Sequence, residues 1–167
     1  LEPNARMVKQ AREHLGLPMT IGSFEDYPGP QQPVDVVSMI QVLPHFADPM
    51  AAIRRSYEVL DANGYLLIET WNRKSLTARL LGKGWHEYSP PSVLHWFHIP
   101  SLQSAVESCG FKKVAYRTAL RWIRIGHAKS LLRHAGKKST LQSLAAKAAY
   151  PIPDSVHVPY PGNDLFW

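Results

Sequence analysis

Residues 34–70 constrain the fold of this 167-residue chain more than any other stretch. The stretch opens at 34–40 with an apolar run rich in β-branched residues, which is typical of a strand covered on both faces in a parallel sheet. Asp48-Pro49 then predicts the N-cap and first turn of a helix, which Asn63-Gly64 is expected to end. A second apolar run at 65–69 follows. The stretch therefore predicts a parallel βαβ unit with a right-handed crossover.

Ligands of a parallel sheet bind beyond the carboxyl ends of its strands. In this unit those ends are residues 39–41 and 69–72, so the sequence predicts a site there. Residues 72–99 are expected to form a lid or insertion over it. The reason is that 85–99 holds two Trp, one Tyr, one Phe and three His with no clean periodicity. A structural loop whose aromatic side chains cover the core is the alternative.

The remaining pattern predicts a single domain over residues 1–167. Helices are expected at 5–15, 76–81, 100–108 and, in two pieces, 120–149. Strands are expected at 18–24, at 111–118 and from 165 onward. Residues 151–162 should be extended because they include four prolines. Residues 119–162 are thus expected to be a basic helical and Pro-rich segment.

Composition places the chain among ordinary soluble domains, with 45% hydrophobic and 19% charged residues. No apolar run approaches the roughly 20 residues that cross a bilayer. Cys109 is the one cysteine, which excludes an internal disulfide and a multi-cysteine metal site, and no metal is expected. A single cysteine also fits a reducing compartment, so a cytoplasmic location is predicted.

The net charge of +6 is concentrated in the last third of the chain. Residues 112–167 carry ten basic and two acidic residues, which indicates an anionic partner or simply a solvated surface. The basic segment 112–138 could contact a membrane surface and receive a lipid-like substrate. Nucleic acid is the rival partner, but it is not expected, because no nucleic-acid motif is present and the aromatics lie outside the basic segment.

Taken in order, the motifs resemble a known family. They are Asp35-Val36-Val37-Ser38, Val42-Leu43-Pro44-His45, Asp48-Pro49, Arg54-Arg55 through Val59-Leu60, Gly64 through Glu69, then Trp85, Pro90-Pro91, Leu94, Phe97, Ser101-Leu102 and Gly110-Phe111. The set resembles the class I S-adenosylmethionine-dependent methyltransferases, in the small-molecule branch similar to the ubiquinone-biosynthesis methyltransferases. The resemblance implies an α/β, Rossmann-like sheet, mostly parallel with an antiparallel strand near the C-terminus. It also implies methyl transfer to a small-molecule or lipid-like acceptor.

The resemblance assigns cofactor-binding roles as well. It implies that Glu2 accepts hydrogen bonds from the ribose hydroxyls of S-adenosylmethionine and that Ser23 and Phe24 contact the adenine. Met39, Ile40 and Gln41 would line the methionine portion. The last three coincide with a strand end that the residue pattern indicates independently.

The chain also departs from the family. It has no Gly-x-Gly-x-Gly run, so an N-terminally truncated fragment is expected, whose unfilled sheet centre would invite strand exchange in a homodimer. A catalytically incompetent remnant is the alternative. Pro44 replaces the glutamate of V-L-E-H, and the histidines that follow the double proline in the family map onto Val93 and Trp96, leaving His95 and His98 out of register.

Methyl transfer to oxygen or nitrogen can need a general base, for which histidine is the usual choice. His45, just past the first strand of the unit, is the first candidate, and His86 and His95 in the expected lid come next; a structural role is the alternative for each. The expected substrate pocket is lined by Trp71, Asn72, Trp85 and Tyr88, whose aromatic rings supply apolar area and a face for a sulfonium.

Overall fold

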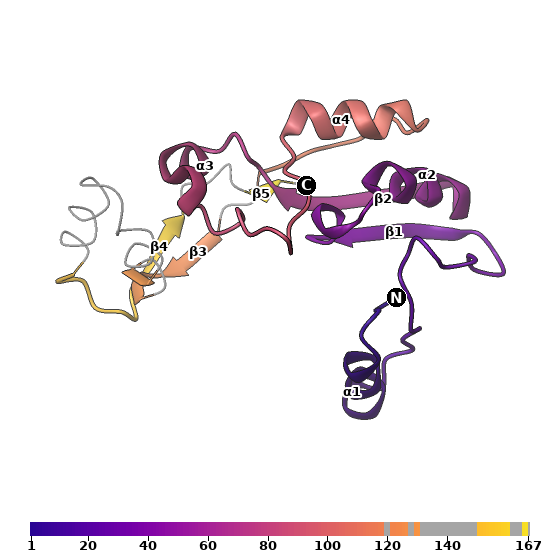
Figure 1. Cartoon of the computed structure of the whole chain (residues 1–167), viewed down its shortest axis with the longest axis horizontal. Coiled ribbons are helices and arrows are strands. Elements are labelled where there is room, and N and C mark those ends of the chain that lie inside the picture. Colours follow the sequence, from indigo (N-terminus) through magenta and orange to yellow (C-terminus); the bar gives the residue numbers. More distant parts are fainter. Residues whose placement is uncertain (119–120, 127–128, 131–149, 161–164, 167) are drawn as a thin grey trace.

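A computed structural model describes residues 1–118, 121–126, 129–130, 150–160 and 165–166 (Figure 1). Its centre is a three-stranded sheet of β1 (Val34–Ile40), β2 (Leu60–Trp71) and β5 (Leu165–Phe166), in the order β1-β2-β5. β1 and β2 pair in parallel and β5 pairs antiparallel to β2. The parallel βαβ unit is confirmed. The sheet itself is mixed rather than mostly parallel over the described residues.

The helix of this unit, α2, runs from Pro49 to Val59 and begins where the sequence predicts. The Asp48 carboxylate accepts a hydrogen bond from the backbone N–H of Ala51 at 2.9 Å, which satisfies one of the unpaired donors of the first turn. Ala52 and Ile53 are fully buried on the inner face of the helix.

The prediction that Asn63-Gly64 ends this helix is wrong, because both residues lie inside β2. They belong to an irregularity in the pairing, where Val34 faces Leu60 but Val36 already faces Tyr65. A Cβ on Gly64 would lie 3.1 Å from the backbone oxygen of Asp35 on the neighbouring strand. The glycine is therefore needed for close approach of the two backbones, not for a left-handed helix end.

The core lies on one face of the sheet. There α2 and α4 (Ile99–Ser108) cover the strands, on the same side in Figure 1. The buried cluster consists of Met39, Leu43, Ala52, Ile53, Ile68, Leu102 and Phe166. On the other face Val36 is 56% and Tyr65 60% exposed. The expectation that β1 is covered on both faces is therefore wrong for the described residues.

The N-terminal part forms α1 (Ala5–Leu15), as predicted, capped by the Asn4 side chain and ended by Gly16 in the left-handed region. The strand expected at 18–24 is reduced to one parallel bridge between Glu2 and Ile21.

Three short helices lie at the carboxyl side of the sheet: η1 (Leu43–His45), α3 (Leu76–Leu81) and η2 (Gly82–Gly84). α3 confirms the helix predicted at 76–81.

Two C-terminal predictions are wrong. Residues 111–117 form no strand, and only Thr118 makes a bridge, to Phe166. The helix expected from residue 120 is replaced at its start by β3 (Arg121–Arg124), which pairs antiparallel with β4 (His157–Tyr160). The run Arg121-Trp122-Ile123-Arg124 has two apolar residues between its cationic ones, so no period of two marks it as a strand, and its pairing with β4 decides its structure. The rest of the predicted helical region lies largely outside the described residues.

Lys129 links its own segment to residues 150–154 through hydrogen bonds and an ion pair. Its side chain is 10% exposed, and its ammonium donates to Asp154 Oδ1 at 2.7 Å and to the backbone oxygen of Tyr150 at 3.2 Å. A buried ammonium is tolerated because these acceptors replace its water shell. No helix among the described residues is both long and apolar enough to cross a membrane.

Gly110 and Gly16 make a matched pair for testing this packing. Both have positive φ, but a Cβ on Gly110 would lie 3.1 Å from the Tyr57 ring, whereas a Cβ on Gly16 would meet nothing within 4 Å. Gly16→Ala is expected to lower the free energy of unfolding by about 1 kcal/mol through backbone strain alone. Gly110→Ala should lower it by at least about 2 kcal/mol because the ring must also move. Urea unfolding measures both, and equal losses would show that the Tyr57 contact is unimportant.

Candidate functional site

The carboxyl ends of β1 and β2 are joined through Gln41 and Glu69. The backbone N–H of Gln41 donates to the backbone oxygen of Glu69 at 2.8 Å, and its side-chain amide donates to Glu69 Oε1 at 3.0 Å. Gln41 has a φ of 57°, the one positive φ of a residue other than glycine in the described chain. Such backbone strain costs about 1–3 kcal/mol and is concentrated at functional sites.

The segment expected to be a lid is tied to this edge of the sheet. The backbone oxygen of Pro44 in η1 accepts from the backbone N–H groups of Leu94 and His95 at 3.0 and 3.2 Å. Just after β2, the backbone N–H of Arg73 donates to the oxygen of Phe97 at 2.8 Å. In Figure 1, α3 of the same segment lies beyond the end of β2. Residues 72–99 therefore contact the predicted edge through their backbone, and their role as a lid or insertion stays a prediction.

His45 follows β1 and contacts this segment through its ring. Its Nδ1 lies 2.6 Å from the backbone oxygen of Ser92. A carbonyl oxygen can only accept, so Nδ1 carries the proton. In the neutral ring, Nε2 is then the basic nitrogen. The ring is exposed, which leaves Nε2 open to a ligand.

Glu87 is a second titratable group at this place. Its carboxylate is 21% exposed, and Oε1 lies 3.5 Å from Nε2 of His86. Its backbone oxygen accepts from the indole N–H of Trp96 at 2.8 Å, which holds the residue in place. Burial raises the pKa of Glu87 above its ordinary value, and the nearby charge of His45 acts in the opposite direction. Glu87 is therefore within electrostatic reach of both histidines.

Aromatic rings surround His86. Its ring meets the rings of Trp71 and Trp85 edge-on, with centroids at 4.7 and 5.8 Å. Trp85 is 4% exposed, and its indole N–H has no hydrogen-bond partner among the described residues. Tyr88 lies with its ring 5.2 Å from that of Trp96. The expected substrate-pocket aromatics thus fall into two ring clusters, one joining Trp71 at the end of β2 to Trp85 through His86, and one of Tyr88 with Trp96.

The other two expected residues have structural partners. The Asn72 side chain accepts from the backbone N–H of Lys74 at 3.0 Å and is 6% exposed, so it shapes the turn after β2. His95 is held through its backbone to Pro44, and its ring centroid lies 6.4 Å from that of Phe97.

The expected cofactor residues come from three segments. Glu2 Oε1 accepts from the backbone N–H of Asn4 at 2.9 Å, and the Ser23 hydroxyl donates to Asp26 at 2.7 Å. The Phe24 ring lies 6.5 Å from that of Phe46, just after η1. Through this ring contact, the segment around residue 24 packs against the chain that follows β1.

The three residues at the end of β1 differ in what they present. Met39 is 3% exposed and belongs to the core, so only its backbone can line a site. Ile40 is 47% exposed on the uncovered face. Gln41 presents the amide that reaches Glu69.

Sequence reasoning did not select Glu69 or Glu87 as site residues. A signal for Glu87 was present, since it is the one acidic residue between Glu69 and Glu107 and lies in the stretch richest in His and aromatics. Among the described residues, no group of three or more His, Cys, Asp or Glu side chains could hold a metal ion.

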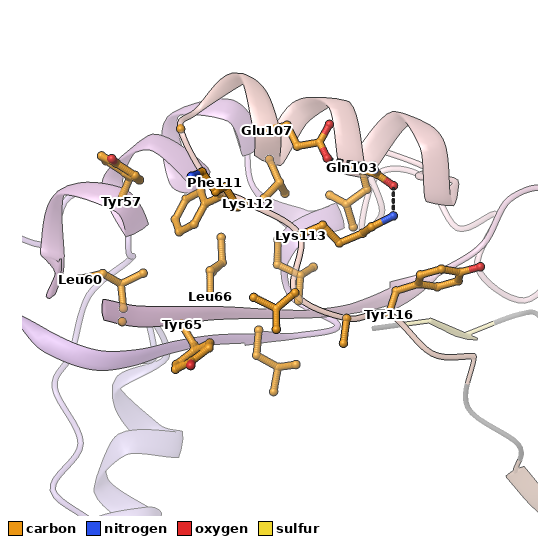
Figure 2. Close-up of a pocket in the computed structure, with 18 of the residues that line it drawn as sticks. Tyr57, Leu60, Tyr65, Leu66, Gln103, Glu107, Phe111, Lys112, Lys113 and Tyr116 are labelled. Carbon is orange, nitrogen blue, oxygen red and sulfur yellow. Dashed lines mark hydrogen bonds between the residues drawn. The ribbon is translucent and has the colours of Figure 1, made fainter. Parts of the chain in front are cut away.

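A separate cavity of about 790 Å³ lies along β2, between residues 60–68, α4 and residues 110–116. Figure 2 shows Leu66 pointing into this space and Tyr65 pointing away from it. The Tyr57 and Phe111 rings meet edge-on at 5.2 Å at one side, and Lys113 donates to Gln103 at 3.0 Å at the other. None of the residues predicted for catalysis or binding lines this cavity.

The electrostatic effect of His45 on the Glu87 carboxyl can be tested by substitution. His45→Gln is expected to raise the pKa of Glu87 further, because the substitution removes the charge that lowers it while burial continues to raise it. The ¹³C signal of the Glu87 carboxyl, followed by NMR against pH, measures this. His14→Gln, on α1, removes an exposed histidine and should leave the Glu87 titration unchanged. An unchanged titration in His45→Gln would contradict the placement of the two groups.

Similarity to known proteins identifies the family of this chain. A family model described as a methyltransferase domain matches residues 2–116. Ubiquinone biosynthesis O-methyltransferase of Xanthomonas campestris pv. campestris is 31% identical over 119 residues, covering 58% of this chain and 49% of the relative. The chain thus spans about half the length of the curated relative that it matches.

Solved structures share the fold. One, a SAM-dependent methyltransferase from Thermotoga maritima described as a "possible histamine N-methyltransferase", has a TM-score of 0.63 at 20% identity, covering 99% of this chain and 68% of that one. A SAM-dependent methyltransferase from Archaeoglobus fulgidus gives 0.60 at 15% identity, covering 98% and 71%. Because the family match extends over more than half of the sequence, this chain belongs to the methyltransferase-domain family.

Proposed function

We propose that the protein transfers a methyl group from S-adenosylmethionine to an oxygen or nitrogen of a small-molecule or lipid-like acceptor, with His45 as the general base. The observation that carries this proposal is the 2.6 Å contact between His45 Nδ1 and the backbone oxygen of Ser92. It fixes the tautomer with a basic Nε2 at the carboxyl edge of the sheet, where ligands of such sheets bind.

S-adenosylmethionine is the methyl donor implied by the family. The side chains at this site have the chemistry to bind its ribose, its adenine and its amino-acid end. The Glu2 carboxylate offers acceptors to a ribose diol, with Asn4 using one oxygen. Phe24 offers an aromatic face for adenine. The Gln41–Glu69 pair offers amide and carboxylate groups to the amino-acid end. The chain has no Gly-x-Gly-x-Gly run, so these residues account for part of a cofactor site.

When bound, the cofactor supplies a methyl group activated by a sulfonium. The protein's part is to orient the acceptor and to remove its proton. Nε2 of His45 would take the proton from the acceptor O–H or N–H, and the electron pair left on the acceptor would form the new bond to the methyl carbon. The carbon–sulfur bond would break at the same time, its electron pair going to sulfur, and a neutral thioether would leave. Trp71, Trp85 and Tyr88 supply apolar surface beside this point.

Cofactor binding can be tested by calorimetric titration with S-adenosylhomocysteine. Micromolar binding is expected, and Glu2→Gln should weaken it about 10- to 100-fold, because a hydrogen bond to a charged group is worth about 1.5–3 kcal/mol. Glu13→Gln, which neutralises an exposed glutamate on α1, should leave the affinity unchanged. No binding by the wild-type protein, combined with salt-sensitive binding of an oligonucleotide, would replace the methyltransferase proposal with a nucleic-acid function.

The role of His45 predicts a kinetic effect. In a methyl-transfer assay over a panel of small phenols, amines and prenylated quinol analogues, His45→Gln should lower kcat by about 10²–10⁴-fold, the range for loss of a general base. The affinity for S-adenosylhomocysteine should not change. His14→Gln serves as the control. Retention of full activity by His45→Gln would contradict the assignment of His45 as the base.

A further inference from the structure

We propose that the cavity beside β2 is a binding groove for an extended peptide segment of a partner protein, which adds to the sheet as an antiparallel strand. The groove is the space of about 790 Å³ between residues 60–68, α4 and residues 110–116. It is lined by none of the residues proposed for methyl transfer, so the inference does not depend on the proposed function.

The first support is the place of β5 at one end of the groove. Phe166 lines the cavity, and it pairs antiparallel with Thr70 of β2 on one side and with Thr118 on the other. At this end the space between β2 and the chain after α4 is therefore one strand wide. Because β5 runs antiparallel to β2, a strand in line with it would lie in the groove along residues 60–68.

The second support is the edge of β2 that faces the groove. β1 pairs with one edge of β2 from Leu60 to Glu69, whereas β5 pairs with the other edge at Thr70 and Trp71 within the described chain. Along residues 60–68 this second edge presents backbone N–H and C=O groups to the groove. A peptide backbone can pair with these groups and a hydrocarbon ligand cannot, so they favour a peptide as the occupant.

The third support comes from the segment on the far side of the groove. Val114, Tyr116 and Thr118 are residue types favoured in strands, and they recur at every second position. Yet in residues 111–118 the structure gives a strand partner to Thr118 alone, and Val114 is 79% exposed. A strand in the groove would supply a neighbour to this segment and to β2 at once.

The lining of the groove indicates which side chains the segment carries. Leu66 points into the groove (Figure 2), and Ile99, Leu102 and Val106 line it from α4. Every second side chain of an inserted strand faces this apolar wall. The segment is therefore expected to have apolar residues at alternate positions.

The charges around the groove are balanced. Its charged lining residues are two acidic and two basic: Asp61, Glu107, Lys112 and Lys113. Lys113 also donates to the side chain of Gln103 at 3.0 Å. A groove without net charge gives no electrostatic preference for an acidic peptide or for nucleic acid, so an uncharged apolar segment fits it best.

The test measures peptide binding by fluorescence anisotropy. The probe is a labelled synthetic peptide of about eight residues that alternates valine with threonine and has a lysine at each end for solubility. Micromolar binding to the wild-type protein is expected. A peptide of the same composition with its valines grouped at one end should bind at least about tenfold more weakly, because fewer of them reach the apolar wall. Methylation of the backbone nitrogens should cause a similar loss, because it removes strand hydrogen bonds.

Two adjacent substitutions in β2 locate the binding site. Leu66→Lys places a charge in the groove and should weaken binding at least about tenfold. Tyr65→Lys is the matched control, because Tyr65 points away from the groove (Figure 2), and it should change the affinity by less than about twofold. Thermal unfolding followed by circular dichroism shows whether each variant is folded. Hydrogen exchange on the wild-type protein needs no substitution, and the peptide should protect the backbone amides of residues 112–116.

Several results would overturn the inference. They are absence of binding by the wild-type protein at about 1 mM peptide, equal binding of the methylated peptide, unchanged binding by a folded Leu66→Lys variant, and unchanged exchange of residues 112–116. Light scattering on the protein alone tests for a second copy of the chain in the groove. A wild-type dimer that Leu66→Lys dissociates and Tyr65→Lys does not would assign the groove to that second copy and also overturn the inference.

Discussion

The parallel pairing of β1 with β2 is the constraint on which the rest of the structure depends. It places Met39 beside Ile68 in register, and both side chains are then buried under α2 and α4 with Ile53 and Leu102. A one-residue slip would turn these side chains to the uncovered face and bring exposed ones into the core. The same register brings Ile40 opposite Glu69, so the edge that carries the candidate site is fixed by the packing of the core.

Backbone hydrogen bonds connect that edge of the sheet to residues 72–99. The Pro44 oxygen accepts two N–H groups from residues 94 and 95, and Arg73 donates to Phe97. Residues that are far apart in the chain, such as His45 and Ser92, meet because of these contacts. The site thus has two supports: the strand ends hold one side of it, and the irregular loop holds the other.

Much of the fold could be predicted from local patterns. β1, α1, α2, α3 and the start of β5 have caps or apolar runs that act over a few residues, and the structure contains them. The wrong predictions concern segments whose structure depends on tertiary contacts. Gly64 meets the backbone of Asp35, which no local pattern reveals. The start of the expected helix after residue 120 became β3 because a partner strand, β4, is present nearly 40 residues later.

For the site, sequence reasoning could identify the sheet edge and individual residue types, but not their pairing. His45 could be selected by its position after a strand, whereas its tautomer depends on the oxygen of Ser92. Asn72 looked available for a ligand because its turn contact with Lys74 is invisible without coordinates. Glu87 was passed over although it follows His86 in the sequence, because the burial that raises the pKa of its carboxyl is set by the fold.

Gln41 combines a strained backbone conformation with a hydrogen bond that offsets the cost of the strain. Glycine would adopt the same backbone conformation without strain, yet it would remove the amide that holds Glu69. The strain and the hydrogen bond are of similar size, about 1–3 kcal/mol each, so stability alone gives no strong preference for glutamine. A substitution at this position would chiefly change how well the Glu69 carboxylate is fixed in place. It would therefore affect the geometry of the candidate site more than the stability of the fold.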